Sequence, residues 1–154
     1  MIPIKLSLHN FMCYRDASLS FDGIHVACLC GDNGNGKSAL LDAMTWALWG
    51  KSRAKSDDEL INLGMTDMEV EFEFAVGRER YRVIRKRSKG KSRRAGQSLL
   101  DLQIADRDGF RSIAGNSIRE TENKIIDTLR MDYDTFINSA YLVQGRADEF
   151  SKKE

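Results

Sequence analysis

Hydrophobic and polar residues alternate in several short stretches of this chain, which is the pattern of half-buried β-strands. These stretches lie at residues 4–8, 17–21, 68–76, 81–83 and 100–104. The stretches 68–76 and 81–83 flank a turn around Gly77 and predict a β-hairpin, with glutamates on its outer face opposite Arg80 and Arg82. A continuous apolar segment at 24–30 and another at 140–143 predict two further strands, the second of which ends at Gln144.

A helical spacing of apolar residues replaces the alternation in three other regions. Residues 39–49 predict a helix that Gly50 ends, and residues 116–131 predict an amphipathic helix with Asn116 or Ser117 as its N-cap. Residues 132–137 predict a short helix, and residues 57–64 predict a helical turn closed by Gly64. The polar segment 51–58 is expected to be a mobile loop.

Between the predicted strand 24–30 and the predicted helix 39–49 the chain reads Gly-Asp-Asn-Gly-Asn-Gly-Lys-Ser, from Gly31 to Ser38. This fits the phosphate-binding P-loop pattern, and strand, glycine loop and helix is the order that the P-loop requires. Glycines let successive backbone N–H groups turn towards a phosphate, and the helix N-terminus adds its positive end. Lys37 is then expected to reach the β- and γ-phosphates, and Ser38 to bind Mg²⁺ through its hydroxyl. The predicted nucleotide-binding residues of the loop are Asn33, Gly34, Asn35, Gly36, Lys37, Ser38 and Ala39.

Composition narrows the class of protein. The chain has 154 residues, of which 42% are hydrophobic, and this suits one domain with a real core. It has no apolar run of membrane-spanning length and no signal-peptide pattern, so we expect a cytoplasmic protein. Cys28 and Cys30 are expected to be small buried residues of the strand, and the cysteines and histidines lack the spacing of metal ligands.

The net charge of +1 hides an uneven distribution along the chain. Between Arg78 and Arg94, ten of 17 residues are Lys or Arg and only Glu79 is acidic. Arg80 and Arg82 are expected to pair with glutamates of the hairpin. The remaining basic residues are expected to have no nearby acidic residue to pair with, so they would either form a solvated loop or contact a nucleic-acid backbone. They are Arg85, Lys86, Arg87, Lys89, Lys91, Arg93 and Arg94.

A P-loop hydrolase also needs an acidic residue after a buried apolar strand, to hold Mg²⁺ and orient water. No run of four aliphatic residues followed by Asp occurs in this chain. A strand beside the P-loop strand is therefore missing, and apolar surface should be left open. The sequence predicts half of a nucleotide-binding domain.

Several short segments together resemble the N-terminal lobe of SbcC, the SMC-like ABC ATPase of double-strand break repair and counterpart of the ATPase in the MRN complex. They are Leu8-His9-Asn10-Phe11, Phe21-Asp22-Gly23-Ile24, Gly31 to Ser38, Trp46 to Gly50 and Tyr141 to Arg146. The resemblance implies an α/β P-loop NTPase fold, lobe I of an ABC-ATPase head, with a mixed sheet that joins an antiparallel hairpin to the P-loop unit. Residues 1–150 would form this lobe, and 151–154 would either begin a coiled coil or lie at an engineered end.

The same resemblance implies roles for further residues. Gln144 matches the family's Q-loop glutamine, which ligates Mg²⁺ or holds the attacking water and, with Lys37, counts as catalytic. Ile61, Asn62 and Leu63 fall where the family touches the adenosine end of ATP. The family often has a basic residue directly after Asn-Phe, but this chain has Met12 there. Either Arg15 takes over that contact or Met12 packs on the base.

For the whole protein the resemblance implies an ATPase with ATP and Mg²⁺ as cofactors. Its partners would be a C-terminal lobe of the same protein, a second head in an ATP-dependent homodimer, an SbcD-like nuclease subunit and double-stranded DNA. No membrane is expected among its partners. This chain alone should be nearly inactive, because it lacks the Walker B acids and the signature motif. An SMC, RecN or RecF-type ATPase without a nuclease is the second hypothesis, and an ABC transporter ATPase is a third. In a bacterium the protein would be nucleoid-associated.

Overall fold

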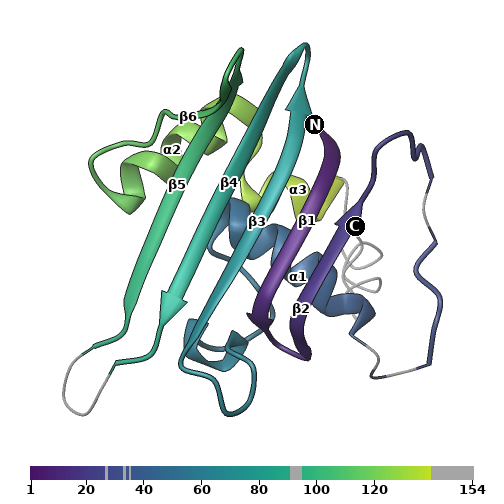
Figure 1. Cartoon of the computed structure of the whole chain (residues 1–154), viewed down its shortest axis with the longest axis vertical. Helices are drawn as coiled ribbons and strands as arrows, with labels where there is room; N and C mark the ends of the chain where they lie inside the picture. Colours follow the sequence, from purple (N-terminus) through teal and green to yellow (C-terminus); the bar gives the residue numbers. More distant parts are fainter. Residues whose placement is uncertain (27, 33, 35, 91–94, 140–154) are drawn as a thin grey trace, which may run out of the picture.

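The computed structural model describes residues 1–26, 28–32, 34, 36–90 and 95–139. Its main feature is a six-stranded sheet in the order β2-β1-β3-β4-β5-β6, in which every described pair is antiparallel (Figure 1). The strands are β1 (Ile2–Phe11), β2 (Tyr14–Ser20), β3 (Asp67–Val76), β4 (Glu79–Ser88), β5 (Gln97–Asp106) and β6 (Gly109–Ser112). The predicted alternating stretches are thus confirmed as strands, whereas β6 was not predicted.

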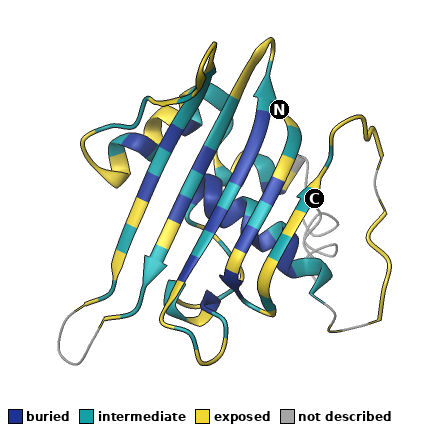
Figure 2. Cartoon of the chain, viewed as in Figure 1, coloured by how far each residue is buried: buried dark blue, intermediate teal, exposed yellow. Residues whose placement is uncertain are grey.

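The sheet is amphipathic because the side chains of each strand alternate between its two faces. Figure 2 shows this as buried and exposed bands that alternate along the strands. The predicted hairpin of β3 and β4 is confirmed, with Gly77 in its turn at a φ of 61°. On its outer face Arg82 lies 3.0 Å from Glu73 and Lys86 lies 2.6 Å from Glu69, so the expected glutamate–cation pairs form across the strands.

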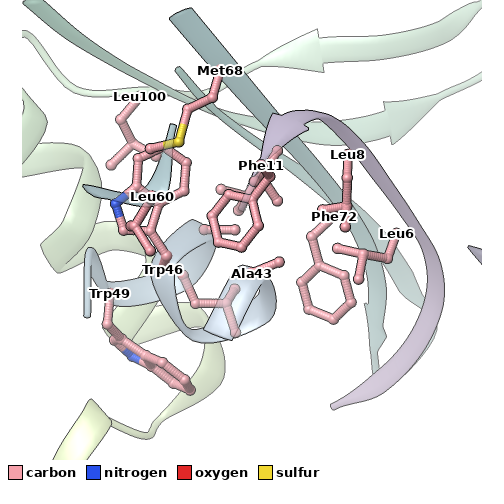
Figure 3. Close-up of a cluster of buried hydrophobic side chains, with 14 of the residues drawn as sticks. Leu6, Leu8, Phe11, Ala43, Trp46, Trp49, Leu60, Met68, Phe72 and Leu100 are labelled. Atoms are coloured by element: carbon pink, nitrogen blue, oxygen red, sulfur yellow. The ribbon is translucent and has the colours of Figure 1, made fainter. Parts of the chain in front are cut away.

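The helices that the structure describes lie on the other face of the sheet, where α1 and α2 contact the strands (Figure 1). They are α1 (Lys37–Trp49), α2 (Ile118–Leu129) and α3 (Tyr133–Ser139), and a 3-10 turn covers Asp57–Leu60. Helix α1 is buried on most of its surface because it lies between the sheet and α2. Figure 3 shows Trp46 and Ala43 of α1 directed at Phe11 and Phe72 of the sheet, which form the centre of the core.

Helices α2 and α3 pack against the C-terminal end of α1. The predicted N-cap of α2 is confirmed at Ser117, whose hydroxyl accepts a hydrogen bond from the backbone N–H of Glu120. Trp49, the last residue of α1, donates from its indole to the carbonyl of Met131 and contacts the rings of Tyr133 and Phe136. The α2–α3 unit is therefore fixed to the helix that follows the glycine loop.

The strand predicted at 24–30 does not form. The described residues of this segment run as irregular backbone beside the sheet, between β2 and the glycine loop (Figure 1). Val26 is 90% exposed, and Cys28 and Cys30 are exposed rather than buried as predicted. A strand needs a neighbour to accept its backbone hydrogen bonds, and none of the described strands pairs with this segment.

Candidate functional site

The glycine loop meets helix α1 in a backbone conformation that requires glycine. Gly34 and Gly36 have φ values of 91° and 80°, in the left-handed region. A Cβ atom on Gly36 would lie 2.5 Å from Cys13 Sγ and 2.9 Å from Tyr14 Oη. Gly36 is therefore restricted both by its conformation and by the β1–β2 turn that packs against it. The neighbouring Asn33 and Asn35, also predicted to bind nucleotide, lie outside the described residues.

The N-terminus of α1 has properties that suit an anion. No side chain among the described residues caps it, and its first turn contains no acidic residue. The backbone of Ala39 donates to the carbonyl of Gly36 at 3.0 Å, which tightens the entry into the helix. Uncapped N–H groups at a helix start attract negative charge and suit phosphate. Ser38 is half-buried in this first turn, where a hydroxyl next to bound phosphate could ligate a cation.

Lys37 points back over the glycine loop. Its ammonium group donates hydrogen bonds to the carbonyl of Gly31 and, at 2.6 Å, to the carbonyl of Asp32. The ammonium group thus joins the first residues of the loop to the N-terminus of α1. Exchanging these neutral carbonyls for phosphate oxygens would give stronger, charge-assisted hydrogen bonds. The loop, the helix start and Lys37 therefore fit a polyphosphate.

The segment predicted to touch adenosine is tied to the turn between β1 and β2. The backbone N–H of Met12 donates to Leu60 at 2.7 Å, and that of Asn62 donates to Asn10 at 2.8 Å. The Asn62 side-chain amide also donates to the carbonyl of Met12, at 2.6 Å. Asn10 and Met12 are left-handed, with φ of 50° and 49°. Such a conformation costs of order 1–3 kcal/mol for a residue other than glycine and persists only where its surroundings fix it.

The three residues predicted to touch adenosine differ in what their side chains can do. Ile61 is 5% exposed and belongs to the core, whereas Leu63 is 94% exposed and available to a ligand. One N–H of the Asn62 amide is used in the hydrogen bond to Met12. Met12 is half-buried and packs against the core, while Arg15 is exposed at the start of β2.

Tyr14 joins the same turn to the glycine loop, and sequence reasoning missed it. Its hydroxyl donates to the carbonyl of Gly36 at 3.2 Å, and partial burial raises its pKa above the ordinary value. No local signal marks this tyrosine, because the contact joins β2 to a loop 22 residues later in the chain. The turn therefore contacts both the predicted phosphate loop and the predicted adenosine segment.

The segment 51–58, expected to be a mobile loop, is instead fastened to α1. Arg53 forms an ion pair with the buried Asp42 of α1 at 2.6 Å, and its guanidinium spans both carboxylate oxygens. The indole of Trp46 donates to Asp57 at 3.0 Å. The prediction failed because the acidic partner Asp42 lies inside an apolar helix, where the sequence pattern gives it no partner.

The prediction that residues 85–87 lack acidic neighbours is also wrong. Arg85 pairs with Glu122 at 2.9 Å, Lys86 with Glu69 at 2.6 Å and Arg87 with Asp58 at 2.8 Å. Arg85 is buried, and its burial lowers its pKa while Glu122 acts in the opposite direction. Its position two residues after the inward-facing Val83 is a signal that could have identified it as inward-facing.

Of the basic residues from 89 to 94, the structure describes Lys89 alone. The ammonium group of Lys89 lies 3.4 Å from the carbonyl of Met65, at the end of the sheet that carries the β1–β2 turn. Lys91, Arg93 and Arg94 lie outside the described residues, as do the predicted strand 140–143 and Gln144. Among the residues that are described, no cluster of three or more His, Cys, Asp or Glu could hold a metal ion.

Comparison with known proteins identifies the family of this chain. A protein family described as "AAA domain" matches residues 5–154. The SbcC component of the nuclease SbcCD from Deinococcus radiodurans is 34% identical over 151 residues, 95% of this chain and 16% of that protein. The DNA double-strand break repair Rad50 ATPase of Halobacterium salinarum is 33% identical over 147 residues, 94% of this chain and 16% of that protein. The chain thus spans about one sixth of the length of these relatives.

Among solved structures the fold is similar to that of the recombination mediator protein RecF-ATP of the RecFOR pathway. The match has a TM-score of 0.52 and 17% sequence identity, and it covers 70% of this chain and 28% of that one. This likeness confirms the predicted fold class of a P-loop ATPase head lobe. The chain belongs to the AAA domain family of P-loop ATPases, as an ATPase segment of the SbcC/Rad50 type.

Proposed function

We propose that this chain is the ATP-binding lobe of a double-strand break repair ATPase of the SbcC type. The observation that carries the proposal is the ammonium group of Lys37, held over the glycine loop beside an uncapped helix N-terminus. This arrangement suits the β- and γ-phosphates of a nucleotide. The names of the relatives, the SbcC component of SbcCD and the Rad50 ATPase, support ATP as the nucleotide and DNA repair as the process.

Lys37 and the N-terminus of α1 would bind and orient the phosphates. The first-turn N–H groups supply fixed dipoles, and Lys37 exchanges the carbonyls of Gly31 and Asp32 for phosphate oxygens. When ATP is bound, Mg²⁺ held by Ser38 and Gln144 would neutralise charge on the phosphate oxygens. Leu63 would lie at the adenosine end, next to the backbone of Ile61 and Asn62. Hydrolysis needs an acidic group that we expect from a second lobe.

A C-terminal lobe is the partner that best accounts for the exposed segment before the glycine loop. Ile24 and Leu29 are 48% and 43% exposed, and Val26 is almost fully exposed. A strand of a second lobe could pair with this segment, complete the sheet beside the glycine loop and cover these side chains. We propose further that two complete heads dimerise around ATP, and that this cycle controls DNA binding and an SbcD-like nuclease in the cytoplasm.

A recombination ATPase of the SMC, RecN or RecF type, without a nuclease, is the second candidate. The likeness of the fold to RecF supports this candidate. The names of the relatives do not mention a transporter, which was the third hypothesis. As a separate observation, none of the described helices is long and apolar enough to cross a membrane. Purification of the full-length protein with a bound nuclease and ATP-dependent cleavage of duplex ends would favour the SbcC type. Its purification without nuclease activity would favour the second candidate.

The substitution Lys37→Ala tests nucleotide binding in the head assembled from this chain and its C-terminal lobe. Removing an ammonium group that makes charge-assisted hydrogen bonds to phosphate should cost about 3 kcal/mol, or roughly a hundredfold in ATP affinity. Titration calorimetry with ATP measures the change. Lys51→Ala, an exposed lysine beyond the opposite end of α1, is the matched control and should bind ATP normally. Equal affinity in the Lys37 variant and the wild type would refute the assignment of the glycine loop.

A further inference from the structure

The turn between β1 and β2 touches both predicted ends of the nucleotide site. On one side Asn62 donates its side-chain amide to the carbonyl of Met12 at 2.6 Å. On the other side Tyr14 donates its hydroxyl to the carbonyl of Gly36 at 3.2 Å. The two contacts therefore lie only two residues apart along the turn.

The turn is held rigidly between its two contacts. Two backbone hydrogen bonds join it to the segment 60–62, and Phe11 is fully buried against Trp46 of α1 with ring centroids 5.9 Å apart. Asn10 and Met12 keep left-handed conformations within it. A strained backbone that is fixed from several sides is typical of segments that position a site.

The phosphate side of the turn packs closely against Gly36 of the glycine loop. A Cβ on Gly36 would come within 3.1 Å of the Tyr14 ring and 2.5 Å of Cys13 Sγ. Any displacement of the turn would therefore move the residue directly before Lys37. Because α1 begins at Lys37, such a displacement would also change the direction in which its first N–H groups point.

We propose that the β1–β2 turn is a strut that fixes the spacing between the adenosine segment and the phosphate loop, with Asn62 and Tyr14 as positioning residues at its two ends. The proposal rests on the proposed ATP binding and deepens it. It assigns Asn62 a role different from base contact, since one of its amide N–H groups already holds the turn through the carbonyl of Met12. It also assigns a function to Tyr14, which the phosphate-binding motif does not include.

If the turn acts as a strut, loss of the hydrogen bond of either Asn62 or Tyr14 should weaken binding of the phosphates themselves. Two ligands distinguish positioning of the phosphate loop from direct contact with the base. They are ATP and inorganic tripolyphosphate, which has no base. In the assembled head, Asn62→Ala and Tyr14→Phe should each weaken both ligands about three- to tenfold, the size expected for one lost hydrogen bond. Tyr14→Phe keeps the ring that packs on Gly36 and removes only the hydroxyl. The double variant should bind each ligand about as tightly as the single variant with the lower affinity. The reason is that losing one contact already removes the fixed spacing.

Controls separate this effect from general destabilisation. Tyr81→Phe removes a hydroxyl on β4 while keeping the ring stacked on Phe74, and Asn116→Ala removes an amide before α2. Both should bind ATP and tripolyphosphate like the wild type. Thermal unfolding identifies any variant that fails to fold, and Asn62→Leu, which keeps the side-chain volume without a donor, then replaces Asn62→Ala.

Three results would overturn the strut. Loss of ATP affinity with unchanged tripolyphosphate affinity in the Asn62 variant would show direct base contact instead. If the fold-loss of affinity in the double variant equals the product of the two single losses, Asn62 and Tyr14 act independently. Unchanged affinities in both single variants would show that the turn does not position the nucleotide. A wild-type head that binds neither ligand would refute the proposed function itself, which is a different outcome.

Discussion

Arg85 offers the sharpest test of the packing described above. It is 5% exposed and reaches from β4 to the C-terminal end of α1, where it donates to the carbonyl of Ala47 at 3.1 Å and pairs with Glu122 of α2 at 2.9 Å. Gly50 leaves room for it, since a Cβ there would lie 2.8 Å from the Arg85 guanidinium. One side chain thus joins the sheet, α1 and α2.

The substitution Arg85→Ala should lower the free energy of unfolding by about 3 kcal/mol. Breaking a buried ion pair costs about 3–5 kcal/mol when the remaining charge stays buried. The lower end applies here because the Glu122 side chain is 30% exposed and can reach water. The carbonyl of Ala47 also loses its donor, at about 1–3 kcal/mol, but this cost is partly contained in the same figure. A loss of this size is a large share of the roughly 5–15 kcal/mol that stabilises a typical domain.

Urea unfolding followed by tryptophan fluorescence measures this loss, because the two tryptophans, Trp46 and Trp49, both lie in α1. At a slope of about 2 kcal/mol per molar urea, the midpoint should fall by about 1.5 M. Lys86→Ala is the matched control: its pair with Glu69 has side chains that are 48% and 35% exposed, so the loss should stay below about 1 kcal/mol. Equal losses in the two variants would refute the reasoning from burial.

Two further predictions concern charge. Reversing the charge of Lys89, Lys91, Arg93 and Arg94 should weaken duplex DNA binding by the full-length protein and flatten its dependence on salt concentration. Electrophoretic shifts at several salt concentrations measure both quantities. Unchanged affinity and an unchanged salt dependence would mean that these residues form only a solvated loop. A hydrogen bond to Asp16 raises the pKa of His9 above 6.5. The pKa of His9 is higher in the folded than in the unfolded state, so the pair with Asp16 stabilises the fold fully below about pH 6.5. This stabilisation is lost as the pH rises through the raised pKa. Because both groups are exposed, it should amount to less than about 1 kcal/mol. Urea midpoints of wild type and His9→Gln at roughly pH 6 and pH 8 test this, and an equal pH dependence in both would contradict it.

Much of the local structure was predictable from the sequence. The alternating stretches are strands of the sheet, Gly77 lies in the predicted hairpin turn and Ser117 caps α2 as expected. These features depend on neighbours in the sequence: the period of the side chains, a turn residue and a capping hydroxyl. The glycine loop belongs to the same class, because its conformation is required by glycines that can be read directly.

Other features were wrong or missed because they depend on partners far away in the sequence. The strand at 24–30 has the right composition, but no strand that the structure describes lies beside it. The segment 51–58 was predicted to be mobile, but the ion pair between Arg53 and Asp42 fastens it to α1. Arg85 reads as part of a basic surface, although its partner Glu122 lies 37 residues away on α2.

By itself, therefore, the sequence determined the periodic elements, the glycines of the loop before α1 and the family. Only the tertiary structure decided that the β1–β2 turn joins Asn62 to Gly36 through Tyr14, and that Arg85 is part of the core rather than of a basic surface. The physical reason is that hydrogen bonds and ion pairs between distant segments depend on how the sheet and helices pack. The pattern of the chain specifies which elements form, but only packing specifies which polar groups meet.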